Sequence, residues 1–192
     1  NSFIMKTEKI TYVLVIVSAL WVVHVLDWIL PVQLNALGIV PRTARGLIGI
    51  ALSPFLHANI FHLIGNTVPL LVLSIILVIF YDKIAPSVIG IVVLVGGGLV
   101  WLLARSANHI GASGVIYGIA AFLIAYGIMN KKILSTIVSV VVIFLYGGSM
   151  LTGLLPLHSF VSWESHLFSA AAGVFAAYVL NRLPSPSAKT GN

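Results

Sequence analysis

The chain has 192 residues, of which 60% are hydrophobic and only 7% are charged, and it carries a net charge of +6. A soluble domain carries about 25% charged residues, so this composition excludes a water-wetted globule and indicates an integral membrane protein of one domain. The basic residues are scattered between apolar runs, which excludes a nucleic-acid-binding patch and fits membrane topology, and the absence of cysteine excludes disulfides.

Six apolar segments are long enough to cross a bilayer as helices, which takes about 20 residues each. We expect spans near 10–30, 58–80, 84–104, 113–129, 133–154 and 165–182. The first apolar run exceeds the core of a signal peptide and lacks a small-residue cleavage site, so we interpret it as a retained span. The predicted fold is an all-α membrane protein, a six-helix bundle. It comprises an N-terminal cytoplasmic segment at 1–9, the six-span domain at 10–183 and a flexible tail at 184–192.

The basic residues predict the orientation of the bundle. With both termini inside, seven Lys and Arg residues are cytoplasmic and three are outside, which favours cytoplasmic termini in a multi-pass protein of the cell membrane. The connections 31–56, 105–112 and 156–165 then face outward. The longest of them, 31–56, is apolar enough for us to expect part of it in the membrane interface.

Polar residues gather at the outward ends of three predicted spans. His62 and Asn66 on the second span are four residues apart and share a helical face, as do Ser113 and Tyr117 on the fourth. His166 opens the sixth span at a comparable depth. Because polar groups inside a membrane are costly, such residues usually face the interior of the bundle or a water-filled cavity. The three clusters can therefore meet.

These residue types suit acyl transfer. A serine hydroxyl becomes a competent nucleophile when an adjacent base, such as a histidine, takes its proton. The tetrahedral intermediate also needs donors aimed at its oxyanion. His62 and Asn66 offer side-chain donors, and the backbone N–H of Ser113 is free because it opens a helix.

Small residues predict that the fourth and sixth spans pack closely. Gly114 and Gly118 form a G-x-x-x-G on one, and Ser169, Gly173 and Ala177 form a stripe on the other. Such stripes let helix backbones approach in lipid. Close packing of these helices would bring His166 to Ser113.

At these residues the sequence resembles the rhomboid intramembrane proteases. The likeness covers about residues 10–182 and rests on six spans and three motifs. These motifs are the G-x-S-G Gly111-Ala112-Ser113-Gly114, the histidine His166 on the sixth span, and the H-x-x-x-N of His62 and Asn66.

The resemblance implies a role for each motif residue. Ser113 is the nucleophile and His166 the general base of a dyad that has no catalytic aspartate. The implied oxyanion hole consists of His62, Asn66 and the Ser113 amide; the implied supporting residues are Tyr117, on which the His166 ring packs, and Gly111 and Gly114. The implied substrates are transmembrane proteins within the lipid bilayer, with no cofactor, no metal and no nucleic acid, and the oligomeric state is left open. By likeness alone, 133–154 is a candidate substrate gate.

Other polar residues receive structural interpretations. The Trp-Arg pair frequent in the family's first loop is absent at Gly46-Leu-Ile-Gly49, which puts the anchoring of that loop in question. His57 matches a frequent family position and is expected to be structural. We expect Glu164 to fix a loop rather than to act as a third catalytic residue, and His109 to cap its loop or face solvent. His158 carries no functional signal.

Two functions of other classes remain as alternatives. One is a catalytically inactive rhomboid-like protein that binds client membrane proteins, and the presence of both Ser113 and His166 disfavours it. The other is a metal or proton transporter lined by histidines (His57, His62, His109 and His166). Its spans lack mid-membrane carboxylates and metal-ligand spacing, which disfavours it as well.

Overall fold

The computed structural model describes residues 2–157 and 161–182, with side chains from residue 7 onward. Every regular element in these ranges is a helix, and the ranges contain no strand, only an isolated bridge between Ile39 and His109. The predicted tail at 184–192 and His158 lie outside the described residues. The all-α fold is confirmed.

The longer elements follow the predicted spans within a few residues, except that the first helix begins eight residues earlier than predicted and includes most of the segment 1–9. They are α1 (Ser2–Ile29), α3 (Ile60–Phe80), α4 (Ala85–Ile91) continued by the π-helical η3 (Val92–Gly96) and α5 (Gly97–Leu103), α6 (Ser113–Asn130), α7 (Ile133–Gly153) and α8 (Trp163–Arg182). Within the described residues, five helices are long and apolar enough to cross a membrane. The 20-residue α8 has the length but less apolarity, because it carries polar residues at both ends and many alanines. That α8 is the sixth membrane span therefore stays a prediction.

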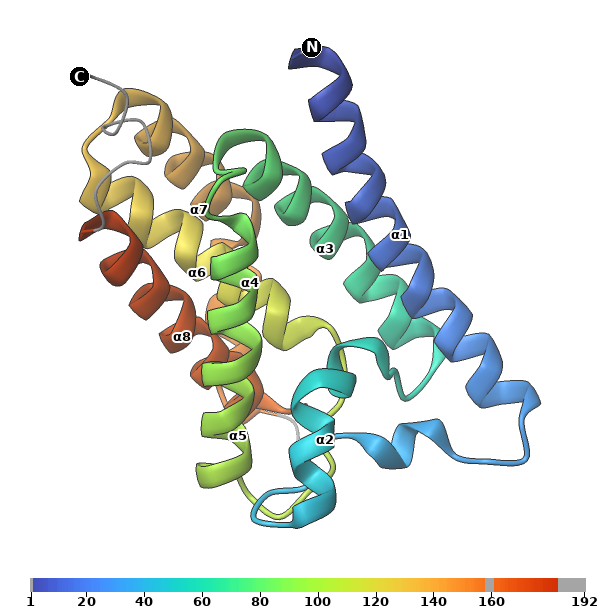
Figure 1. The fold of residues 1–192 in the computed structure, drawn as a ribbon. Coiled ribbons are helices and arrows are strands. Elements are labelled where there is room, and N and C mark those ends of the chain that lie inside the picture. The colour runs from blue at the N-terminus through green and yellow to red at the C-terminus, as the bar shows by residue number, and fades with distance from the viewer. Residues whose placement is uncertain (1, 158–160, 183–192) are drawn as a thin grey trace, which may run out of the picture.

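Helix α6 lies at the centre of the bundle (Figure 1). It is the most buried of the candidate spans, and α3, α4, α7 and α8 all pack against it. Successive long helices run in opposite directions, so α1 begins and α8 ends toward the same end of the bundle (Figure 1). The first residues of α6 and α8 consequently meet at the opposite end.

Glycines permit a close contact between α6 and α8. A Cβ atom on Gly173 of α8 would lie 2.1 Å from the Gly118 carbonyl oxygen of α6, and one on Gly118 would lie 2.3 Å from Val92. A Cβ on Gly114 would lie 3.0 Å from the Ser169 hydroxyl. The predicted packing of the two small-residue stripes is confirmed.

The connection between α1 and α3 is structured. It contains η1 (Leu34–Leu37), α2 (Ala44–Leu52) and η2 (Ser53–Phe55). The Arg42 guanidinium donates to the carbonyls of Leu102 and Ala104 at 3.1 and 2.9 Å, and Trp101 Nε1 donates to the Thr43 carbonyl at 2.8 Å. These contacts anchor the loop to the end of α5.

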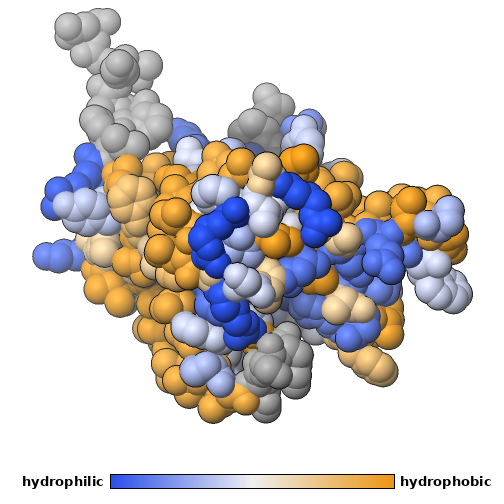
Figure 2. Space-filling model, turned by 90° about the horizontal axis from the view of Figure 1, so that it is seen from below, coloured by the Kyte–Doolittle hydropathy of each residue, from blue (hydrophilic) through white to orange (hydrophobic). Residues whose placement is uncertain are grey.

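The face formed by α2 and the loops is polar at its centre. Figure 2 shows hydrophilic side chains gathered there and hydrophobic ones around them. On α2, Leu47 and Ile48 are exposed. The distribution fits the expected interfacial location of this connection, which stays a prediction.

Helix α1 packs on α3 and adds polar contacts along its length. Lys9 forms an ion pair of 2.6 Å with Asp82, and this hydrogen bond is the main cause that lowers the pKa of Asp82. Trp21 Nε1 donates to Thr67 Oγ1 at 3.2 Å. These contacts join α1 to α3 and to the turn that follows α3.

Replacing Gly173 with alanine should separate α6 from α8, because the new methyl group would overlap the Gly118 carbonyl. We expect the free energy of unfolding in detergent to fall by roughly 1–3 kcal/mol, the usual cost of overpacking. Gly98→Ala is the matched control, because a Cβ there has no atom within 4 Å. Equal stability of both variants would contradict the close contact.

Candidate active site

Ser113 is the first residue of α6, and the backbone before it is held in an unusual conformation. Gly111 has φ +118°, which L residues rarely adopt, and its N–H donates to the Ser53 carbonyl at 2.9 Å. A Cβ on Gly111 would also lie 2.7 Å from the His62 ring. Position 111 therefore requires glycine for two reasons: the turn needs its backbone conformation, and His62 occupies the space where a side chain would lie.

Ser113 and His166 are in hydrogen-bond contact. The Ser113 Oγ to His166 Nε2 distance is 2.9 Å, and the His166 Nδ1 to Gly153 carbonyl oxygen distance is 2.8 Å. A carbonyl only accepts, so in the neutral ring Nδ1 carries the proton and Nε2 presents its lone pair to the serine. The Tyr117 ring stacks on His166 with centroids 4.1 Å apart and planes at 6°. The imidazole is thereby fixed in both position and tautomer.

The predicted oxyanion donors lie at different distances from Ser113 and His166. His62 packs against Gly111 and is partly exposed, next to Ser113. Asn66 is buried one turn further along α3, and its Nδ2 donates to the His62 carbonyl at 2.7 Å. The Ser113 N–H belongs to the first turn of α6, where no helical carbonyl can reach it. The structure brings His62 to the serine, whereas the amide of Asn66 is bonded within its own helix.

His57 supports the turn that precedes the serine. It is almost fully buried, and its Nε2 accepts a hydrogen bond from the Ala112 N–H at 3.4 Å. Its ring meets His62 edge to face with centroids 5.1 Å apart. Burial, and secondly the neighbouring His62, lowers the pKa of His57 from 6.5 to about 4, so the ring stays neutral and able to accept.

A second polar network fixes the start of α8. His109 is buried and contacts the Ser162 hydroxyl, which in turn contacts Ser165 at 2.6 Å. Glu164 is buried in the first turn of α8, with the Arg105 guanidinium 3.5 Å away. The prediction of a loop position for Glu164 is wrong because the helix begins earlier than expected. Of the two roles expected for His109, facing solvent is wrong because the ring is buried, whereas its 3.0 Å contact with the Arg105 carbonyl fits the loop-capping role.

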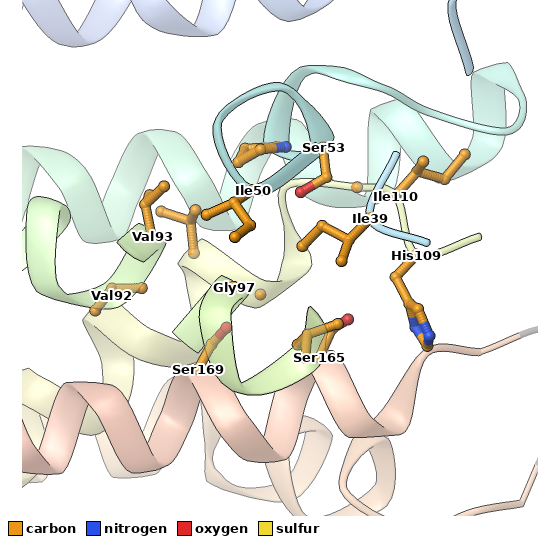
Figure 3. A pocket seen from close by; sticks show the side chains of 15 residues that line it. Ile39, Ile50, Ser53, Val92, Val93, Gly97, His109, Ile110, Ser165 and Ser169 are labelled. Carbon is orange, nitrogen blue, oxygen red and sulfur yellow. The ribbon is translucent and has the colours of Figure 1, made fainter. Parts of the chain in front are cut away.

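A small cavity with both apolar and polar residues in its wall adjoins the turn at the start of α6 (Figure 3). Its volume is about 30 Å³, and one water needs about 10–15 Å³ on this measure, so the cavity has space for roughly two waters. The hydroxyls of Ser53, Ser165 and Ser169 point toward this space, and Gly111 and Gly114 form part of its wall. Ser169, three residues after His166, adds one of these hydroxyls to the cavity.

The histidines of the transporter alternative belong to separate contacts. His57 and His62 touch each other, His109 lies in the network of α8, and His166 faces Ser113. In the part of the chain that the structure describes, no three His, Asp or Glu side chains are grouped as metal ligands.

The sequence analysis did not predict the backbone groups that bind Tyr117 and His166. Ser149 and Gly153 near the end of α7 supply carbonyls to Tyr117 and His166. Any residue type can supply a backbone carbonyl, so the sequence does not mark such an acceptor. The glycine at position 153 could have indicated a close contact at this point of the helix. A Cβ there would lie 1.8 Å from the Tyr117 hydroxyl.

Acidification should destabilise the fold through His57. Between pH 6.5 and about 4, the unfolded chain binds a proton at this residue that the folded chain does not, so the free energy of unfolding falls with the pH. His57→Gln keeps an acceptor for the Ala112 N–H and does not titrate. We expect its melting temperature to depend less steeply on pH, with His109, whose pKa burial also lowers, contributing to the remaining slope. Identical profiles for variant and wild type would contradict this assignment.

Comparison with known proteins shows the family of this chain. The model of the family described as "Rhomboid domain" matches residues 44–183. The chain is 37% identical over 180 residues to the uncharacterized protein Rv1337 of Mycobacterium tuberculosis, an alignment that covers 89% of this chain and 75% of the relative. It is 35% identical over 187 residues to the uncharacterized protein ML1171 of Mycobacterium leprae, covering 93% and 72%. No solved structure matches. The chain belongs to the rhomboid family of membrane proteins.

Proposed function

We propose that this protein is an intramembrane serine endopeptidase that hydrolyses peptide bonds in or near the transmembrane segments of other membrane proteins. The observation that carries the proposal is the 2.9 Å contact between Ser113 Oγ and His166 Nε2, with Nδ1 held by a carbonyl at 2.8 Å. Family membership supports it.

Acylation would begin with proton transfer. His166 Nε2 takes the Ser113 proton as Oγ attacks the substrate carbonyl carbon, and the carbonyl oxygen becomes an oxyanion. Collapse of the tetrahedral intermediate breaks the C–N bond, and the protonated His166 returns the proton to the leaving amine. The product of this stage is an ester on Ser113. Tyr117 beneath the ring keeps it aligned throughout.

Three donors are proposed for the oxyanion: the His62 ring, the Asn66 amide and the Ser113 N–H. An amide nitrogen carries two hydrogens, so the bond from Asn66 to the His62 carbonyl leaves one of them for the substrate. One such donor contributes about 10²–10³ in rate in other serine proteases. His57 holds the Ala112 N–H and so positions the turn that carries Ser113.

Deacylation needs water at a site surrounded by apolar helices. The cavity of about 30 Å³ lies beside Gly111 and Gly114, which flank Ser113 in the chain, and has space for such a water next to serine hydroxyls in its wall. A water that moves from this cavity to the dyad attacks the ester carbon while His166 takes its proton. Collapse of this second tetrahedral intermediate breaks the C–O bond to Ser113, and the protonated His166 returns the proton to Ser113 Oγ as the carboxyl product leaves. In the predicted orientation, this chemistry takes place toward the outer face of the membrane and both termini are cytoplasmic.

A fluorophosphonate probe tests the nucleophile. It should label the wild-type protein, because an activated serine attacks its phosphorus and displaces fluoride to form a phosphonate ester, and it should fail on Ser113→Ala. Ser74→Ala, which removes a buried serine of α3 outside the site, is the matched control and should label normally. Cleavage of a single-span substrate should follow the same pattern and be insensitive to EDTA. Activity that persists in Ser113→Ala and is lost with a chelator would support a metal-dependent function instead.

Substrate choice should depend on helix stability. A helix hides its carbonyls in internal hydrogen bonds, so an intact span cannot be attacked. We expect faster cleavage when Gly or Pro is placed near the cut site of a single-span substrate, because these residues weaken the helix by about 1 and 3 kcal/mol. Cut rates can be compared by gel for otherwise identical substrates, and equal rates would count against this mechanism.

A further inference from the structure

Another pocket lies at the end of the bundle opposite the dyad. Its wall consists of the turn after α3 (80–84), Tyr126 and Asn130 at the end of α6, and residues at the start of α7. Its volume is about 320 Å³, which is within the range of ligand pockets, about 300–1,000 Å³. We call it the turn pocket. No residue of its wall contacts Ser113 or His166, so the proposed chemistry leaves this pocket without a role.

Two lysines bring positive charge to the turn pocket. Lys83 and Lys132 belong to its wall and are exposed. Neither ammonium group forms a hydrogen bond or an ion pair with another described residue. The acidic residue of the wall, Asp82, is already paired with Lys9 at 2.6 Å. With three lysines against one aspartate, the surroundings of the pocket favour an anion.

Helix α7 begins at the turn pocket without a side-chain cap. The side chain of its N-cap residue, Lys132, makes no capping hydrogen bond. The backbone N–H groups of residues 133–135 have no acceptor among the described residues, and the first to find one is that of Thr136, which donates to the Lys132 carbonyl. The start of a helix also carries partial positive charge. Free N–H groups in such a field are donors for an anion.

A buried hydroxyl without a partner belongs to the same wall. The Tyr81 side chain is 9% exposed, and its hydroxyl forms no hydrogen bond with a described residue. The Ser135 hydroxyl is a polar neighbour, but the two groups lie outside hydrogen-bond geometry, and Ser135 accepts from Asn130 Nδ2 at 3.3 Å instead. A buried donor left unpaired is costly. An acceptor bound in the pocket would remove this cost.

Apolar side chains beside these groups indicate a ligand that is amphiphilic. Phe80 and Leu134 of the wall are 43% and 55% exposed, and Ile133 next to them is 81% exposed. They lie at the ends of two candidate membrane spans, α3 and α7, where hydrocarbon meets headgroups. A free phosphate ion has no part that these side chains could contact, whereas a phospholipid has both a charged head and apolar chains. In the predicted orientation this end faces the cytoplasmic leaflet, which attracts basic residues through its anionic lipids.

We propose that the turn pocket binds the phosphate of an anionic phospholipid headgroup. The ammonium groups of Lys83 and Lys132 neutralise its charge. The free N–H groups at the start of α7 and the Tyr81 hydroxyl donate to its oxygens, and the acyl chains run along Phe80 and Leu134. The bound headgroup joins the turn after α3 to the start of α7. The site does not depend on the proposed protease function, and its tests need no activity.

The melting temperature of the purified protein in a nonionic detergent reports binding, because a ligand that binds only the folded state raises it with concentration. Three probes are compared: dioctanoyl phosphatidylglycerol, phosphatidylcholine with the same chains, and inorganic phosphate. We expect a saturating rise with phosphatidylglycerol and no comparable rise with the other two. An equal rise with phosphatidylcholine would show that only the acyl chains bind. An equal rise with inorganic phosphate would show a site for free anions, and either result would overturn the proposal.

Lys132→Gln and Lys131→Gln are a matched pair, because both positions are exposed and adjacent but only Lys132 belongs to the wall. The apparent Kd for phosphatidylglycerol should rise about fivefold in Lys132→Gln and in Lys83→Gln, the effect expected of one lysine near an anionic lipid. It should be unchanged in Lys131→Gln. Equal weakening by Lys131→Gln and Lys132→Gln would indicate diffuse attraction by the basic surface and would contradict a defined site.

Tyr81→Phe tests the buried hydroxyl and keeps the ring, which packs against Tyr126 with centroids 5.2 Å apart. Without lipid, the variant should melt no lower than the wild type, because the lost hydroxyl had no partner. Its affinity for phosphatidylglycerol should fall severalfold. Unchanged affinity would overturn the assignment of this hydroxyl to the phosphate. Native mass spectrometry gives a second readout: the wild type should retain one phosphatidylglycerol, and Lys83→Gln with Lys132→Gln should retain none.

Discussion

The site depends on the approach of α6 and α8 at Gly118 and Gly173. In lipid, apolar side chains gain little by leaving one apolar surrounding for another, so helices associate through close packing. The missing side chains let the two backbones come together along a line that ends at Ser113 and His166. At larger helix separations, the 2.9 Å contact between the two side chains would be lost.

Polar groups at membrane depth impose the second constraint, because each must find a partner inside the protein. His57, His109 and His166 are all buried, and each bonds to a backbone or hydroxyl group of another segment. The same contacts that satisfy these rings also hold the loops around the serine. The same hydrogen bonds therefore maintain both the stability of the fold and the geometry of the site. Protonation of the buried, uncharged His57 at low pH would break one of them.

Much of the fold and the side chains of the site followed from sequence periodicity. A spacing of four residues places Ser113 with Tyr117 on one face, and small residues at the same spacing indicated which helices touch. Backbone partners could not be predicted, because any residue can offer the carbonyl that Gly153 supplies. Apolarity alone did not establish that α8 crosses the membrane, since this helix packs through alanine and glycine rather than through large apolar side chains. Arg42 anchors the first loop from a left-handed conformation, φ 59°, that sequence alone did not indicate.

Helix α1 stands apart from this arrangement. It precedes the region matched by the family model, 44–183, and it contributes no residue to the dyad. Its ion pair with Asp82 is partly exposed, and such pairs contribute little, typically 0–1 kcal/mol. The exposed side chains of α1, among them Val15, Val22 and Trp28, form its outer surface, so this surface can adapt to different bilayers or neighbouring proteins while the buried face of the helix stays unchanged.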